Sequence, residues 1–130
     1  MIFLLMILLH IYDDFVSQPV CLSKLKQKSF WENDKIGSNP MYKDDYKCAL
    51  FIHGLSWAIM VHLPMIALQF IHGYQWGEEF IVGSVILNAL AHTVIDDQKA
   101  NHYTIDLVCD QILHFIQLVI IYVLWSEYIF

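Results

Sequence analysis

The sequence contains no arginine. All seven basic residues are lysines, and six of them fall between Lys24 and Lys47. The chain therefore has no basic face with guanidinium forks for the bases or phosphates of a nucleic acid. It also lacks a P-loop, a glycine-rich nucleotide fingerprint, a nucleophile elbow and an HExxH motif. We predict no nucleic-acid partner, and any catalysis would rely on a metal-bound water as the nucleophile.

Cysteine is scarce as well. Cys21, Cys48 and Cys109 share no CxxC spacing, and their number is odd. This pattern disfavours a disulfide framework. Because free cysteine behaves as a small apolar residue, we expect the three side chains to be buried.

Charge of either sign is rare. Only 15% of the 130 residues are charged, 58% are hydrophobic, and the mean hydropathy is +0.50. A chain of this length suits one domain. Soluble domains are richer in charged residues than this chain is. The composition therefore predicts a surface that faces lipid, and an all-α integral membrane protein with the bilayer as its main partner.

Four apolar segments stand out, and a helix needs about 20 residues to cross a bilayer. The N-terminal segment has no basic n-region and reaches Asp13 and Asp14 without a small-residue cleavage site, so we interpret it as a retained helix. We predict a single transmembrane domain over residues 1–130, built as a four-helix bundle. The predicted helices cover about 1–18, 47–70, 80–97 and 105–128.

The long connection, residues 19–46, is rich in lysine. Within it Leu22, Leu25, Phe30 and Trp31 could form the apolar side of an interfacial amphipathic helix. In a four-span topology this loop and the loop with Lys99 share one side, which then holds every lysine. The positive-inside rule makes that side cytoplasmic, with both termini outside. An outer aromatic belt would contain Tyr74, Trp76, Tyr122, Trp125 and Tyr128.

Polar residues inside the apolar segments form a pattern. Three of the four segments contain a His and an Asp four residues apart: His10 with Asp14, His92 with Asp96, and Asp110 with His114. Residues four apart on a helix lie on one face, so each pair presents a nitrogen and a carboxylate side by side. The second segment adds His53.

The order within each pair is informative. Segments 1–18 and 80–97 run in one direction and read His then Asp, whereas 105–128 runs the opposite way and reads Asp then His. At about 1.5 Å per residue from the outer end, Asp14 lies roughly 20 Å in, Asp96 about 24 Å and Asp110 roughly 27 Å. His53 comes to roughly 25 Å. All seven side chains should therefore share one layer near the cytoplasmic end.

Ionisable groups in a bilayer are costly and need partners. Neutral imidazoles with carboxylates are a usual ligand set for Zn²⁺, Mn²⁺ or Fe²⁺, and helical bundles can hold two metals. We predict one or two divalent ions. The alternatives are a hydrogen-bonded core network without metal and a proton relay or ion path. The predicted ligands are His10, Asp14, His53, His92, Asp96, Asp110 and His114.

Neighbouring polar residues are sorted by helical position. Gln18, Lys99 and Asp106 lie on the helix faces that carry the His and Asp pairs (the stripe), so they could support the ligands. Lys99 could also bind a phosphate or carboxylate. His62 lies nine residues from His53, and we interpret it as a core histidine; His72 and His102 receive no role. Three residues one position off the stripe are expected to be solvated or interfacial: Asp13, Asp97 and Gln111.

The pattern resembles a bacterial and phage membrane family of unknown function catalogued as domain 3307, over nearly the whole chain. The matching pieces are His10-x3-Asp14-Phe15 with Gln18, His53 in Leu50-Phe51-Ile52-His53, His92-x3-Asp96-x2-Lys99 and Asp110-Gln111-x2-His114. The resemblance implies a multi-pass protein of the bacterial inner membrane with these residues as its signature. The sequence is more distantly similar to the YdjM-like membrane proteins, which are described as metal-dependent hydrolases. The long lysine-rich first loop and Ser17 depart from the family pattern.

Two functional hypotheses remain open. The first is a metal-dependent hydrolase near the cytoplasmic leaflet, acting on a phosphoester of a lipid or small amphiphile. A metal-bound water would attack, Asp14 or Asp96 would take its proton, and Lys99 would neutralise the leaving phosphate. The second is a non-enzymatic protein, either a metal or proton carrier or a partner-binding phage membrane protein.

Overall fold

The computed structural model describes residues 1–33, 39–73 and 77–127, and the chain is all-α, with no strand in these ranges. Residues 34–38 of the long loop lie outside them, as do Tyr74, Trp76 and Tyr128 of the predicted aromatic belt. The elements are α1 (Ile2–Tyr12), the π-helix η1 (Asp13–Ser17), α2 (Val20–Leu25), α3 (Lys28–Asn33), the 3-10 helix η2 (Pro40–Tyr42), α4 (Asp45–His72), α5 (Glu78–Ala100) and α6 (Leu107–Ser126).

Local sequence explains where several helices end. Pro19 follows η1 with extended backbone at Gln18, and α2 begins directly after it. Gly73 closes α4 in the left-handed conformation (φ 70°), which glycine adopts without steric cost. Asp106 begins α6, and its carboxylate accepts a hydrogen bond from the Cys109 amide at 2.8 Å.

Three helices in the described part of the chain are long and apolar enough to cross a membrane. They are the helical stretch Pro40–His72, which contains α4, together with α5 and α6. The predicted first segment, 1–18, is present as the 11-residue α1 followed directly by the five-residue η1. It is shorter than the roughly 20 residues of a full crossing and is not among the three candidate spans, so the predicted bundle of four transmembrane helices is not confirmed.

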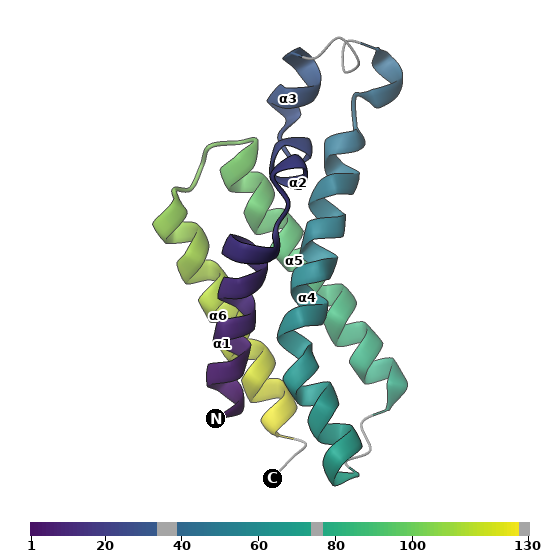
Figure 1. The fold of residues 1–130 in the computed structure, drawn as a ribbon, viewed down its shortest axis with the longest axis vertical. Coiled ribbons are helices and arrows are strands. Elements are labelled where there is room, and N and C mark those ends of the chain that lie inside the picture. Colours follow the sequence, from purple (N-terminus) through teal and green to yellow (C-terminus); the bar gives the residue numbers. More distant parts are fainter. Residues whose placement is uncertain (34–38, 74–76, 128–130) are drawn as a thin grey trace.

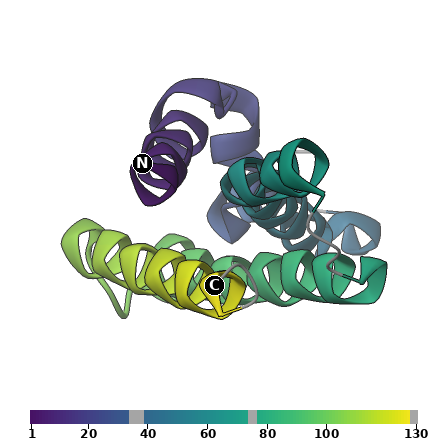
Figure 2. The ribbon, with the colours of Figure 1, turned by 90° about the horizontal axis from the view of Figure 1, so that it is seen from below.

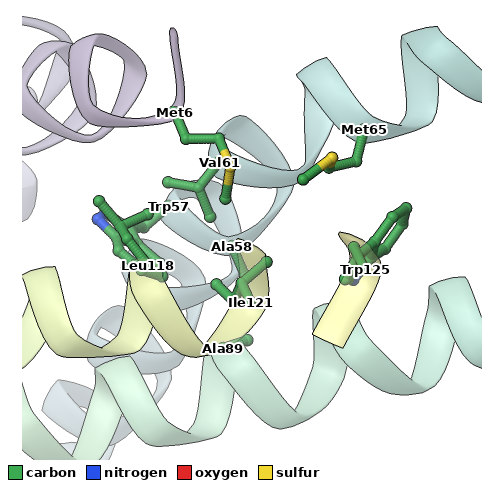
Figure 3. Packing of buried hydrophobic residues seen from close by; sticks show 9 residues of the cluster. All are labelled: Met6, Trp57, Ala58, Val61, Met65, Ala89, Leu118, Ile121 and Trp125. Carbon is green, nitrogen blue, oxygen red and sulfur yellow. The ribbon is translucent and has the colours of Figure 1, made fainter. Parts of the chain in front are cut away.

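The long helices enclose one core. Figure 1 shows α2 and α3 at one end of the molecule, beside the upper part of α4, and the N-terminus with the last turns of α6 at the other end. Seen along the long axis of the molecule, α1 and α4 lie on one side and α5 and α6 on the other (Figure 2). Trp57 and Val61 of α4 pack between the two sides (Figure 3). The other buried members are Met6, Ala58, Met65, Ala89, Leu118, Ile121 and Trp125.

Exposure of polar and apolar residues is the reverse of that in a soluble protein. Large apolar side chains cover the outside of the long helices, among them Leu87 (69% exposed) and Val94 (60%). Polar groups are buried instead, since ionisable side chains avoid lipid. The buried polar residues are His10, Asp13, His53, His62, His92, Asp96, Asp110, His114 and Gln117. This distribution is that of a protein whose long helices face a membrane.

The expectation for the cysteines was half wrong. All three are free, in agreement with the absence of a disulfide framework, but all three are exposed rather than buried. Cys48 lies on α4 and Cys109 on α6, helices whose outer faces are apolar. A thiol costs little on such a surface, so burial is not required.

Close approach of α4 and α5 depends on Gly54. A Cβ at this position would lie 2.5 Å from Thr93 Oγ1 and 2.7 Å from the carbonyl oxygen of Ala89. The carbonyl belongs to the backbone of α5, so a side chain must push the two helices apart. We expect Gly54→Ala to lower the unfolding free energy by about 1–3 kcal/mol. Thermal unfolding in detergent micelles tests this, with Gly83→Ala, where a Cβ meets open space, as the control.

Candidate metal centre

The structure brings the three predicted pairs and His53 into one buried network. His53 Nε2 lies 3.6 Å from Asp14 Oδ1 and 3.3 Å from Asp96 Oδ2. His114 Nε2 lies 3.4 Å from an oxygen of Asp96 and 3.4 Å from an oxygen of Asp110. His10 Nδ1 is 3.4 Å from Asp14 Oδ2. The seven side chains come from α1, η1, α4, α5 and α6, and each contacts another member of the set.

Two groups of three within this network could each hold a metal ion. They are Asp14 with His53 and His92, and His92 with Asp96 and His114; in each group the ligand atoms lie within 4.8 Å of one another. The ring nitrogens of His53 and His92 are 3.3 Å apart. Ligands bonded to one tetrahedral ion at about 2.1 Å are separated by roughly 3.4 Å. Because both groups use His92, the geometry suits one central ion better than two separate ones.

Several buried atoms of the network make no hydrogen bond within the described part of the chain. The carboxylate oxygens Oδ1 of Asp14 and Asp110 are among them, together with Nε2 of His114 and Nδ1 of His92. Buried polar atoms almost always have a partner, so such a cluster requires an explanation. Imidazole nitrogens and carboxylate oxygens are the donors that divalent transition metals take from proteins. The residues therefore fit a metal ion.

Two lysines compensate part of the negative charge. Lys26 Nζ donates to Asp96 Oδ2 at 2.6 Å, and Lys99 Nζ donates to Asp110 Oδ2 at 2.6 Å. With neutral histidines, the carboxylates of Asp13, Asp14, Asp96 and Asp110 against these two ammonium groups leave a charge of −2. One divalent cation neutralises that charge.

Lys26 was missed at the sequence level, where it counted only as a lysine of the long loop. It lies at the end of α2, and its side chain is 12% exposed. No local pattern indicates this contact, since Lys26 and Asp96 are 70 residues apart. The loop segment thus supplies a charge to the centre, in addition to the interfacial role predicted for it.

The expectation that Asp13 is solvated was wrong. Its side chain is buried, and Oδ1 accepts hydrogen bonds from Ser56 at 2.9 Å and Ser17 at 3.2 Å. The cause is η1, because a π-helical turn takes more residues than an α-turn and changes which side chains face inward. Helical spacing counted at 3.6 residues per turn places Asp13 off the inner face. Both Asp13 and Asp14 face inward here.

Two predicted ligands lie at the edge of the centre. Trp57 Nε1 donates to His10 Nδ1 at 2.7 Å, so neutral His10 carries its proton on Nε2. Asp110 Oδ2 accepts from Lys99 and from Gln111 at 3.0 Å. Neither His10 nor Asp110 belongs to the two metal-compatible groups. Their positions suit support of the inner residues.

Trp57 is a second residue that the sequence did not single out. Its indole stacks on His92, with ring centroids 4.5 Å apart, and is tilted against His114 at 5.7 Å. It is fully buried and also belongs to the apolar core. Trp57 therefore fixes the orientation of three imidazoles, through two ring contacts and one hydrogen bond.

The remaining polar residues separate from the centre. His62 Nδ1 pairs with the Ala58 carbonyl at 2.7 Å and Nε2 with Ser84 Oγ at 2.8 Å, as expected of a core histidine. Asp106, expected to support the ligands, is exposed and caps α6 instead. Asp97 is part-exposed and pairs with His102 at 3.2 Å.

Comparison with known proteins identifies the family. The model of the family described as "Protein of unknown function (DUF3307)" matches residues 2–129. The chain belongs to this family. Neither a curated protein nor a solved structure matches it significantly. This match confirms the resemblance to the domain 3307 family, but it confirms neither a bacterial or phage origin nor the distant likeness to YdjM-like proteins, and the family description names no activity.

Proposed function

We propose that this DUF3307 protein is a membrane-embedded metalloprotein that hydrolyses a phosphoester of a lipid or small amphiphile. The observation that carries the proposal is the buried convergence of Asp14, His53, His92, Asp96 and His114, with ligand-type atoms that lack hydrogen-bond partners. A purely structural polar core would satisfy these atoms, as it does for His62.

The proposed setting is the bacterial inner membrane. In this arrangement α1 with η1 serves as a fourth, short membrane segment, and α4, α5 and α6 span the bilayer. The end with α2 and α3 faces the cytoplasm, because the lysines of the chain gather there. Both termini then face outward, and the centre lies near the cytoplasmic leaflet.

The proposed chemistry assigns roles to the chain's own groups. A bound divalent ion would supply Lewis acidity and a water with a lowered pKa. A carboxylate at the centre, Asp14 or Asp96, accepts the proton of that water. Lys99 is one-third exposed beside Asp110, so its ammonium can turn to a phosphoryl oxygen that carries negative charge.

A metal or proton carrier is the second candidate. The observation in its favour is the continuity of titratable groups from His10 to Asp110, with successive contacts of 3.9 Å or less. Such chains serve proton relays in membranes. Turnover of chromogenic phosphoesters with added Mn²⁺ or Zn²⁺ supports the hydrolase. Ion uptake into proteoliposomes without turnover supports the carrier.

Metal analysis of purified protein tests the centre itself. We expect about one divalent ion per chain in the wild type, because one such ion neutralises the buried charge and fits the shared His92. The double variant Asp96→Ala/His114→Ala should lose at least nine-tenths of it. His62→Gln, which changes a buried histidine with two partners, is the matched control and should retain the ion. Equal content in all three proteins, or none in any, refutes the metal centre.

A further inference from the structure

A groove runs along the outer face of the molecule between α5 and α6. It encloses about 480 Å³, within the size range of pockets for small ligands. Leu87 and Ile120 border it from the two helices and are 69% and 53% exposed. The walls are largely apolar, with Phe80, Ala91 and Leu124 as further members. An apolar groove on membrane-facing helices is suited to a hydrocarbon chain.

Polar side chains line the groove toward both ends: Glu79 beside Phe80, and Asn88 with Gln117 nearer the metal centre. Gln117 is 7% exposed, and its Nε2 donates to the backbone carbonyl of Asn88 at 2.8 Å and to Asn88 Oδ1 at 3.1 Å. Asn88 Nδ2 in turn donates to the Ser84 carbonyl at 2.8 Å. Both partners of Gln117 are acceptors, which fixes its nitrogen toward them. Its Oε1 is a buried acceptor with no hydrogen-bond donor among the described residues.

The Gln117 end of the groove is near the metal centre along both helices. Asn88 lies four residues before His92 on α5, and Gln117 lies three residues after His114 on α6. Each is therefore about one helical turn from a residue of the centre. From Ala91 to Phe80 the groove extends about 16 Å along α5, roughly half the thickness of a bilayer core. Its length is that of one lipid leaflet.

We propose that this groove binds the hydrocarbon chain of a single-chain amphiphile, and that a hydroxyl of its headgroup donates a hydrogen bond to Gln117 Oε1. This inference deepens the proposed hydrolase and rests on it in one respect, that the bound amphiphile is the substrate of the adjacent metal centre. A partner helix is a poorer occupant, since an α-helix with side chains is about 10 Å wide and the groove has the volume of a small-molecule pocket. The substrate class is therefore a lysolipid-like phosphoester with a free hydroxyl.

Photolabelling tests occupancy without requiring metal or turnover. The probe is a monoacylglycerol phosphate with a diazirine in its acyl chain, added to the full-length protein in detergent, and adducts are mapped by mass spectrometry. We expect adducts concentrated on Leu87, Ala91, Ile120 and Leu124. Ala91→Trp should fill the groove and reduce them at least fivefold. Leu90→Trp adds the same ring to an exposed position of α5 outside the groove and should leave them unchanged.

The polar contact is tested separately with Gln117→Leu. This variant should bind the hydroxyl-bearing amphiphile about five- to tenfold more weakly, as expected for one lost hydrogen bond. Binding of an alkyl phosphate with the same chain length but no hydroxyl should be unchanged. Equal weakening for both ligands contradicts the role of Gln117 Oε1.

Other outcomes overturn the proposal. Adducts spread evenly over all exposed helix faces mean that the groove does not bind the chain. A groove protected from the probe, together with a changed oligomeric state of Ala91→Trp, assigns it to a partner helix. Because the experiment is run without metal, groove labelling stands even if metal analysis finds no ion, and in that case only the link to hydrolysis fails.

Discussion

Replacing Lys26 by methionine should lower the unfolding free energy of the metal-free protein by about 3–5 kcal/mol, because it removes the partner of a buried charge. Lys26 Nζ is 2.6 Å from Asp96 Oδ2, and the two side chains are 12% and 4% exposed. Without the ammonium group, Asp96 retains only neutral histidines and other carboxylates near it. Methionine keeps the length of the aliphatic chain, so most of the lost free energy is electrostatic.

A bound ion should reverse most of this loss. The ion would bind near Asp96 Oδ1, the oxygen that faces His114, whereas Lys26 contacts Oδ2. With the ion present, the carboxylate keeps a cationic partner in the variant, so the loss should fall below about half. By thermodynamic linkage, the variant should therefore bind the ion more tightly than the wild type does. The reason is that the metal-free centre of the variant carries a charge of −3, whereas that of the wild type carries −2.

Thermal unfolding in detergent, with EDTA and with excess Zn²⁺ or Mn²⁺, measures both effects. Lys28→Met is the matched control, because Lys28 is also in the loop segment but is 46% exposed and lies 3.6 Å from Glu32. Exposed pairs contribute little, so this variant should unfold like the wild type. An identical loss for Lys26→Met with and without the ion would show that Lys26 acts independently of a metal.

The layer of ligands could be predicted from the sequence because helical geometry is regular over long segments. His92 with Asp96 and Asp110 with His114 lie on uninterrupted helices, where a spacing of four fixes a common face. The reversed order of the second pair fixes a common depth. Contacts of 3.4 Å between His114 and each of the two aspartates show that this reasoning holds where the backbone is regular.

The sequence could not predict what depends on irregular backbone or on docking between distant segments. Asp13 faces inward only because η1 is π-helical, and nothing in the five-residue sequence of η1 reveals the wider turn. Lys26 reaches Asp96 only because the residues after α2 lie beside the last turns of α5, where Asn101 Nδ2 also donates to the Lys26 carbonyl at 3.1 Å; Lys26 and Asp96 are 70 residues apart in sequence. In the sequence Trp57 is one apolar residue among many, and only the folded structure shows that its indole nitrogen donates a hydrogen bond to His10.

Trp57→Phe and Trp125→Phe should have similar effects on stability but different effects on metal affinity. Trp57 and Trp125 are both fully buried, and both donate a hydrogen bond from Nε1, to His10 at 2.7 Å and to Ser84 at 3.0 Å. Either Trp→Phe change should therefore cost about 1–3 kcal/mol of unfolding free energy through the lost volume and hydrogen bond. On stability alone the two variants should be similar.

Metal affinity should distinguish the two variants. Trp57 contacts His10, His92 and His114, so its loss releases imidazoles from their orientation, and such supporting contacts change metal affinity by roughly 10–100-fold. Trp125 contacts His62 and Phe80 instead, and Trp125→Phe should leave the affinity within about twofold of the wild type. Calorimetric titration with Zn²⁺ or Mn²⁺ measures the ratio. Equal losses in both variants would mean that affinity follows overall stability, and that Trp57 does not position the ligands.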